Sequence, residues 1–121
     1  MKHLITGLLM IFAHTAIAAD KSGNFAIWGA GQKSCYNYSN ARKSEDDSYY
    51  RYYLMGYLTA YNTQTPETYR ISGNKNLSDI LTWLDNYCES KQVVGFDHAL
   101  GDFTAEHYPG RYKSSSAAGR R

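Results

Sequence analysis

Cys35 and Cys88 are the only cysteines in this chain of 121 residues, and the leader that precedes them predicts a compartment in which they oxidise. An even number of cysteines in a short exported chain is typical of disulfide bonding. A bond between these two would close a loop of about 54 residues, which the chain-entropy model values at ~4 kcal/mol. The alternative is a reactive cysteine with a histidine partner, which an oxidising compartment disfavours. We therefore expect a small domain cross-linked by one disulfide.

The prediction of export rests on a signal peptide at residues 1–18. A basic start precedes the apolar run 4–13, and Ala16 and Ala18 place small residues where signal peptidase reads them. The apolar run is shorter than the roughly 20 residues needed to span a bilayer, so a retained membrane anchor is the less favoured alternative. Nothing later in the chain is long and apolar enough for a transmembrane helix. A periplasmic or secreted protein without a stable membrane span is predicted.

Cleavage after Ala18 would leave about 100 residues, enough for one domain. We expect a single helical domain at 19–112 and a disordered tail at 113–121, because the tail has nothing to bury. Of the 13 lysines and arginines, 12 remain after loss of Lys2, against 11 acidic residues. A chain so nearly neutral gives no electrostatic reason to bind nucleic acid.

The first long helix is predicted to start at Ser44, whose hydroxyl precedes three acidic residues suited to a helix N-terminus. It should end near Asn62. One face has the helical spacing i, i+3, i+4, i+7, i+8 and i+11, with the residues Tyr50, Tyr53, Leu54, Tyr57, Leu58 and Tyr61. Other apolar side chains lie around it, so we expect a central helix that a neighbour approaches closely at Gly56 and Ala60.

Two further helices follow in the sequence. The second starts at a cap, either Asn76 or Ser78, and carries an apolar stripe that ends at Cys88. The third starts at Phe96 and stops before Pro109. Residues 35–42 could form a brief helix or an irregular segment, and no strand pattern of useful length appears. The fold class is therefore all-α, a small helical bundle of three main helices plus a short N-terminal segment, held by the disulfide.

The best catalytic candidates are His98, Asp102 and Glu106, which are spaced by four along the third helix. Such a column of titratable groups suits acid–base chemistry or a weak metal site. It is also what a solvated helix face looks like, with a modest pair between residues four apart, and we favour that interpretation. His107, on the apolar stripe, is expected to be partly buried in the core. No zinc spacing, nucleophile motif or cofactor motif is present, so no metal, cofactor or catalytic residue is assigned.

A binding surface is the alternative use of the tyrosines. Tyr49, Tyr52 and Met55 should project away from the core face of the first long helix. Tyrosine gives a large contact area at low entropic cost and is enriched at protein interfaces. The competing interpretation is that a small domain needs these side chains to cover a second core face. We nominate these three residues as the protein-binding site.

Several short segments resemble a known group of small exported helical proteins. They are the first cysteine, a helix reading Gly-Tyr-Leu-Thr-Ala-Tyr-Asn at 56–62, and Trp-Leu-Asp-Asn-Tyr-Cys at 83–88. Over residues 34–108 this outline resembles the HdeA-like proteins and is similar to the Tai-like immunity proteins. The first resemblance implies a periplasmic acid-stress chaperone with one disulfide. The second implies a stoichiometric inhibitor of a peptidoglycan amidase, and neither implies an enzyme.

The function expected from the sequence is therefore non-catalytic protein binding after export. An HdeA-like chaperone or related stress role leads, and an immunity protein against a cell-wall-degrading toxin is the alternative. A small secreted hydrolase using His98, Asp102 and Glu106 is the third hypothesis. The expected partner is another protein, either a client or a cell-wall enzyme, and a homodimer is one candidate assembly.

Overall fold

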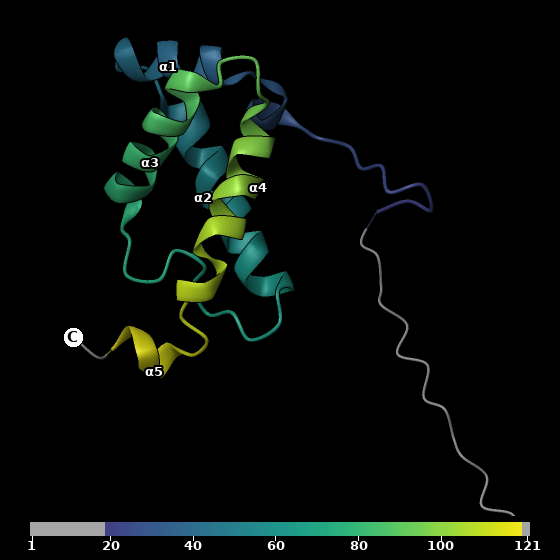
Figure 1. Ribbon diagram of the computed structural model, residues 1–121, viewed down its shortest axis with the longest axis vertical. Helices are drawn as coiled ribbons and strands as arrows, with labels where there is room; N and C mark the ends of the chain where they lie inside the picture. Colours follow the sequence, from purple (N-terminus) through teal and green to yellow (C-terminus); the bar gives the residue numbers. More distant parts are fainter. Residues whose placement is uncertain (1–18, 120–121) are drawn as a thin grey trace, which may run out of the picture.

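The computed structural model describes residues 19–119, in which the regular structure is entirely helical (Figure 1). The predicted signal peptide lies outside the described residues. The all-α prediction is confirmed, and the segment left open at 35–42 is a helix. In chain order the elements are the 3-10 turn η1 (Gly29–Gln32), α1 (Cys35–Lys43), α2 (Ser48–Gln64), α3 (Leu77–Ser90), α4 (Phe96–His107), the 3-10 turn η2 (Tyr108–Gly110) and the single turn α5 (Ser115–Ala118).

The start of α2 differs from the prediction. Ser44 ends α1, where its hydroxyl donates to the carbonyl of Asn40 at 2.7 Å. The chain then turns through Glu45, whose φ is +55°, and α2 begins at Ser48 with Asp47 in the N-cap position. The prediction that Ser44 caps the long helix is wrong. Its hydroxyl donates to carbonyls at the end of α1 instead of accepting from an N–H of α2.

The start of α3 agrees with the prediction and selects one of its two alternatives. The Asn76 side chain accepts from the Asp79 N–H at 2.9 Å, and the Asp79 carboxylate accepts from the Asn76 N–H at 2.9 Å. Reciprocal bonding of this kind satisfies two backbone donors that a helix leaves unpaired, and the cap is worth about 1 kcal/mol. Asn76 rather than Ser78 is the cap.

The disulfide between Cys35 and Cys88 is confirmed. It joins the first turn of α1 to the last turn of α3 across a Cα–Cα distance of 4.9 Å, and both residues are fully buried. Backbone bonds reinforce the same corner, since the N–H of Cys35 donates to the carbonyl of Val94 at 2.7 Å. The N-terminus of α1 is therefore fastened both to α3 and to the loop that leads into α4.

Phe96, the first residue of α4, is the centre of an aromatic core. Its ring stacks on Tyr38 of α1 at 5.0 Å and meets Tyr50 of α2 edge-on at 5.1 Å. Tyr38 and Tyr50 also contact each other edge-on at 5.6 Å. Each such pair adds about 0.5–1.5 kcal/mol beyond its buried area. Three helices are thus held together by rings around one phenylalanine.

The expectation that α2 is a central helix is wrong. Only Tyr50 and Leu54 are buried along its length, and a Cβ placed on Gly56 would have no neighbour within 4 Å. Gly56 and Ala60 are both exposed, so no segment packs on them. Figure 1 shows the reason: α3 and α4 lie on the same side of α2, which leaves the other side of that helix uncovered.

The long connection between α2 and α3 packs on the segment that follows α4. Arg70 pairs with Tyr112 in an isolated antiparallel bridge, and the Ile71 N–H donates to the Asn62 side chain at 2.8 Å. Gly73 has a φ of +58°, and a Cβ there would lie 2.6 Å from the carbonyl oxygen of Gly110. A side chain at residue 73 would force the two segments apart. Along residues 19–119, none of the helices has the length and apolar character to cross a membrane.

Candidate functional site

The three residues nominated for protein binding lie on the uncovered side of α2 or at its edge. Tyr49 is 52% exposed, Tyr52 71% and Met55 40%. Tyr49 leans toward η1, because its hydroxyl lies 3.6 Å from the point where a Cβ on Gly29 would be. These side chains do not form a second core face, so they are accessible to a partner.

The segment before η1 adds further exposed apolar side chains. Phe25 is 69% exposed and Trp28 79%, and the chain before them leads away from the helices (Figure 1). The glycines that follow explain the geometry: a Cβ on Gly31 would lie 2.2 Å from the Tyr53 hydroxyl. This close approach places the segment over Tyr53 and leaves the indole outside the core.

A cavity of about 530 Å³ lies between this segment and helices α2 and α4. Its walls are largely aromatic and apolar, with Phe25, Ile27 and Trp28 on one side and Tyr53 and Tyr57 on the other. A volume of this size falls in the range that holds small ligands or inserted side chains. We call it the arm cavity, since the segment 25–28 forms one wall.

The carboxylates and the histidine of the arm cavity come from two turns of α4. Asp97, His98, Gly101 and Asp102 occupy positions i, i+1, i+4 and i+5, which share one face of a helix. Gly101 contributes no side chain, and a Cβ there would lie 3.9 Å from the Tyr57 hydroxyl. No lysine or arginine of the described chain lines the cavity.

The tyrosines of the cavity respond to burial and to a neighbouring carboxylate. Burial raises the pKa of Tyr53 above its usual value, and the negative charge of Asp97 raises it further. Burial likewise raises the pKa of Tyr57, with a smaller contribution from the same carboxylate. Both phenols therefore stay neutral at ordinary pH, and the charge of the cavity comes from its aspartates.

The column His98, Asp102 and Glu106 lies along the boundary between α3 and α4. The Tyr87 hydroxyl donates to Asp102 at 2.6 Å, and the Trp83 indole N–H donates to Glu106. His98 contacts Asp102 at 3.5 Å, the pair expected of an ordinary helix face. Two of the three predicted chemical groups thus serve as acceptors for aromatic donors of α3, and they connect these two helices.

Burial and the bond to Asp102 have a measurable consequence at Tyr87. Burial, followed by this hydrogen bond, raises the pKa of the Tyr87 phenol to about 12.

His107 lies at the other end of the same boundary, where its ring stacks on Phe103 at 4.1 Å and Nδ1 lies 2.7 Å from the Phe103 carbonyl oxygen. The prediction of a partly buried core histidine is confirmed.

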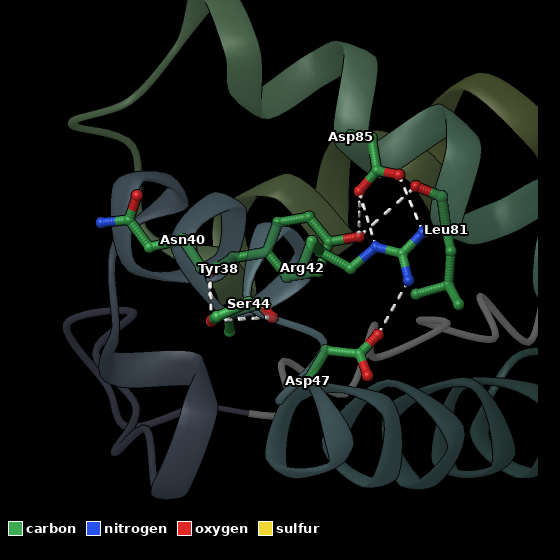
Figure 2. A network of polar contacts seen from close by, with 8 residues as sticks. Tyr38, Asn40, Arg42, Ser44, Asp47, Leu81 and Asp85 are labelled. Carbon is green, nitrogen blue, oxygen red and sulfur yellow. Dashed lines mark hydrogen bonds and ion pairs between the residues drawn. The ribbon is translucent and has the colours of Figure 1, made fainter.

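The Arg42 cluster, drawn in Figure 2, was not predicted from the sequence. The guanidinium donates to both carboxylate oxygens of Asp85, each at 2.9 Å, and to Asp47 at 2.8 Å. The Tyr38 hydroxyl also donates to Asp85 at 2.8 Å. Asp85 accepts bonds from two residues of α1, because α1 packs beside α3. The only sequence signal was an arginine in the last turn of α1.

Bonding to Asp85 raises the pKa of the Arg42 guanidinium, while burial followed by the same carboxylate raises the pKa of Tyr38. The cluster connects α1, the start of α2 and α3. Bidentate pairs of arginine with carboxylate are among the stronger charge-assisted contacts. We regard this cluster as structural.

Residues 19–119 contain no group of three or more histidine, cysteine, aspartate or glutamate side chains placed to hold a metal ion. Comparisons of the chain with protein-family models, with curated proteins and with solved structures give no match.

Proposed function

We propose that this chain is a non-catalytic, exported protein that binds another protein through the exposed side of α2. The observation that carries the proposal is the set of large apolar side chains left uncovered at Tyr49, Tyr52 and Met55. Tyrosine and methionine supply contact area that adapts to a partner at low entropic cost. Trp28 extends the same surface through Tyr49, which lies beside η1.

Export is supported by two independent features. The leader at residues 1–18 has the organisation of a signal peptide. The buried disulfide between Cys35 and Cys88 is typical of proteins from oxidising compartments. These two features together support the proposal of a periplasmic or secreted location.

The resemblance to HdeA-like and Tai-like proteins agrees with a binding role, because both groups act by contacting other proteins. We place first a stoichiometric complex with one folded partner at neutral pH, as for an immunity protein. The exposed side of α2 supports this order, since it is accessible in the folded state and needs no unfolding to be presented.

The test is site-specific photo-crosslinking in the exporting host. A photoreactive phenylalanine analogue at residue 52 should yield one discrete cross-linked species, whereas the same analogue at Thr82, exposed on α3, should yield none. The purified partner should then form a one-to-one complex that Tyr52→Ser with Met55→Ser weakens at least tenfold, with unchanged circular dichroism. Equal cross-linking from both positions, or an unaffected complex, would contradict the proposal.

An acid-activated chaperone is the second candidate, and the Arg42 cluster favours it. Charge-assisted hydrogen bonds of this cluster connect three helices, and carboxylates as a class are protonated at pH 2–3. The protein would then bind a hydrophobic dye and suppress aggregation of a denatured client at pH 2–3. Absence of both effects at that pH would remove this candidate.

The hydrolase hypothesis stays a prediction. Hydrogen bonds from Tyr87 and Trp83 to Asp102 and Glu106 favour a structural use of the column. Loss of a measured activity in His98→Ala, with helicity retained, would be the result that restores an enzymatic role.

A further inference from the structure

We propose that the arm cavity receives a basic side chain, arginine in preference to lysine, from the protein partner. The inference rests on the proposed function, because it assigns one anchor of the complex to a definite place on this chain. The cavity lies against α2, since Tyr53 and Tyr57 line it from the same helix that carries Tyr52 and Met55.

The walls of the arm cavity suit a flat cation. Phe25 and Trp28 face the cavity from the segment before η1, and Tyr53 and Tyr57 face it from α2. Aromatic faces attract cations through the ring quadrupole, and the guanidinium also stacks on them as a plane. An aliphatic side chain would gain only burial from the same walls.

The negative charge of the cavity favours a positively charged occupant. Asp97 and Asp102 lie in its lining, whereas the chain supplies no lysine or arginine there. Among the described residues, no donor forms a hydrogen bond to the Asp97 carboxylate, which is half-buried. Asp102 accepts from Tyr87 through Oδ2, so its other oxygen remains for a second donor. An incoming cation would complement both carboxylates.

The protein itself contains a related arrangement in which the cation is present. In the Arg42 cluster, one guanidinium lies between Asp47 and Asp85, and the Tyr38 hydroxyl donates to Asp85 (Figure 2). The arm cavity offers two aspartates and several rings, but its arginine is missing from this chain. Because bidentate hydrogen bonding and stacking both depend on the planar guanidinium, arginine should bind better than lysine.

The experiment titrates the isotopically labelled protein with Nα-acetyl-arginine methylamide and follows amide resonances by NMR. We expect saturable shifts in residues 97–102 of α4 and in residues 53–57 of α2. The neutral analogue Nα-acetyl-citrulline methylamide, which has nearly the same shape, should bind at least fivefold more weakly. Equal binding of the two amides, or shifts confined to other residues, would overturn the inference.

Two variants localise the charge. Asp97→Asn and Asp102→Asn should each weaken binding of the arginine amide about fivefold, and the spectra themselves report whether the variants are folded. Asp46→Asn, which removes an exposed carboxylate outside the cavity, is the matched control and should leave the affinity within twofold. Unchanged affinity in both cavity variants would overturn the inference, as would tighter binding of tetramethylammonium, which would assign the cavity to a small quaternary amine.

The outcomes separate this inference from the proposed function. A partner that cross-links at residue 52 without any binding of the arginine amide would reject the cavity assignment alone. Selective binding of the arginine amide without any cross-linked partner would retain the cavity assignment and reject the proposed function.

Discussion

The Arg42 cluster and the arm cavity contain the same types of residue, but these residues have different roles in the two places. Each brings tyrosine rings together with a pair of aspartates at the meeting of helices. In the first, the chain supplies the arginine, and each nitrogen of its guanidinium donates to Asp85 or to Asp47. In the second, the aspartates of α4 lie beside an open aromatic wall without a lysine or arginine from the chain.

The difference separates stability from recognition. A pair of carboxylates that an arginine of the chain neutralises fixes the positions of helices. Removing that arginine leaves the two negative charges without compensation. In the arm cavity, no lysine or arginine of the described chain lies beside Asp97 and Asp102, so both carboxylates remain available to an external cation. The disulfide belongs to the first region, since it also joins α1 to α3. We therefore expect stability to depend on the α1–α3 side and binding to depend on the α2–α4 side.

The largest effect should come from removing the disulfide. Cys35→Ala with Cys88→Ala should lower the free energy of unfolding by about 3–4 kcal/mol, because the unfolded chain regains the freedom of a long loop. Chemical denaturation followed by circular dichroism measures the loss. Reducing agent should destabilise the wild type similarly and leave the double variant unaffected. A transition midpoint that does not move would place the main fastening of the bundle elsewhere.

The next effect should come from Arg42→Met, which keeps an unbranched apolar stem and removes the charged guanidinium. We expect a loss of about 2 kcal/mol in the free energy of unfolding, since two aspartates lose charged donors in a partly exposed site. A double-mutant cycle with Asp85→Asn should show coupling between the two residues. Additive losses would contradict a cooperative cluster.

A matched pair of substitutions compares how much the two regions contribute to the free energy of unfolding. Asp85→Asn should cost about 1–2 kcal/mol, because it breaks the bidentate contact with Arg42. Asp97→Asn should change the free energy of unfolding by less than about 0.5 kcal/mol. The same denaturation measurement serves both. Equal losses would mean that the arm cavity is as structural as the Arg42 cluster.

The smallest effect concerns pH. The folded state holds the pKa of Tyr87 at about 12, above the value of 10.0 for a free phenol, so it binds the proton more tightly than the unfolded state. The corresponding stability is complete below pH 10 and is lost as the pH rises toward 12. Tyr87→Phe should therefore reduce the slope of stability against pH in this window. Tyr38, whose pKa is also raised, should maintain part of that slope in the variant. An unchanged slope would contradict the role of the Asp102 contact.

The sequence predicted best where a pattern depends on neighbours in the chain. The stripe of α3, its cap at Asn76 and the start of α4 at Phe96 follow from helical spacing and from local hydrogen bonding. It failed where one local signal had two uses, as at Ser44, whose hydroxyl could begin one helix or end another. The exposure of Tyr52 was left open. Periodicity shows which residues share a face of a helix, but it does not show how many of these faces other elements cover.

The candidate site was predictable only in part. Tyr49, Tyr52 and Met55 were placed on the correct side of their helix, whereas the arm cavity was not foreseen. Its walls come from residues 25–28, 53–57 and 97–102, which the fold brings together from three separate parts of the chain. The approach of Gly31 to Tyr53 that positions the first wall leaves no mark in the sequence beyond a glycine.

The amino-acid order alone determined the helical class, the oxidised pair of cysteines and the faces of the later helices, because each depends on composition or on residues within one or two turns. The tertiary structure decided which faces stay uncovered, which aspartates receive an arginine and which do not. These outcomes depend on how helices pack, since a side chain on α1 meets α3 only after both helices are in place. The same aspartate residue type therefore stabilises one side of the molecule and remains available for binding on the other.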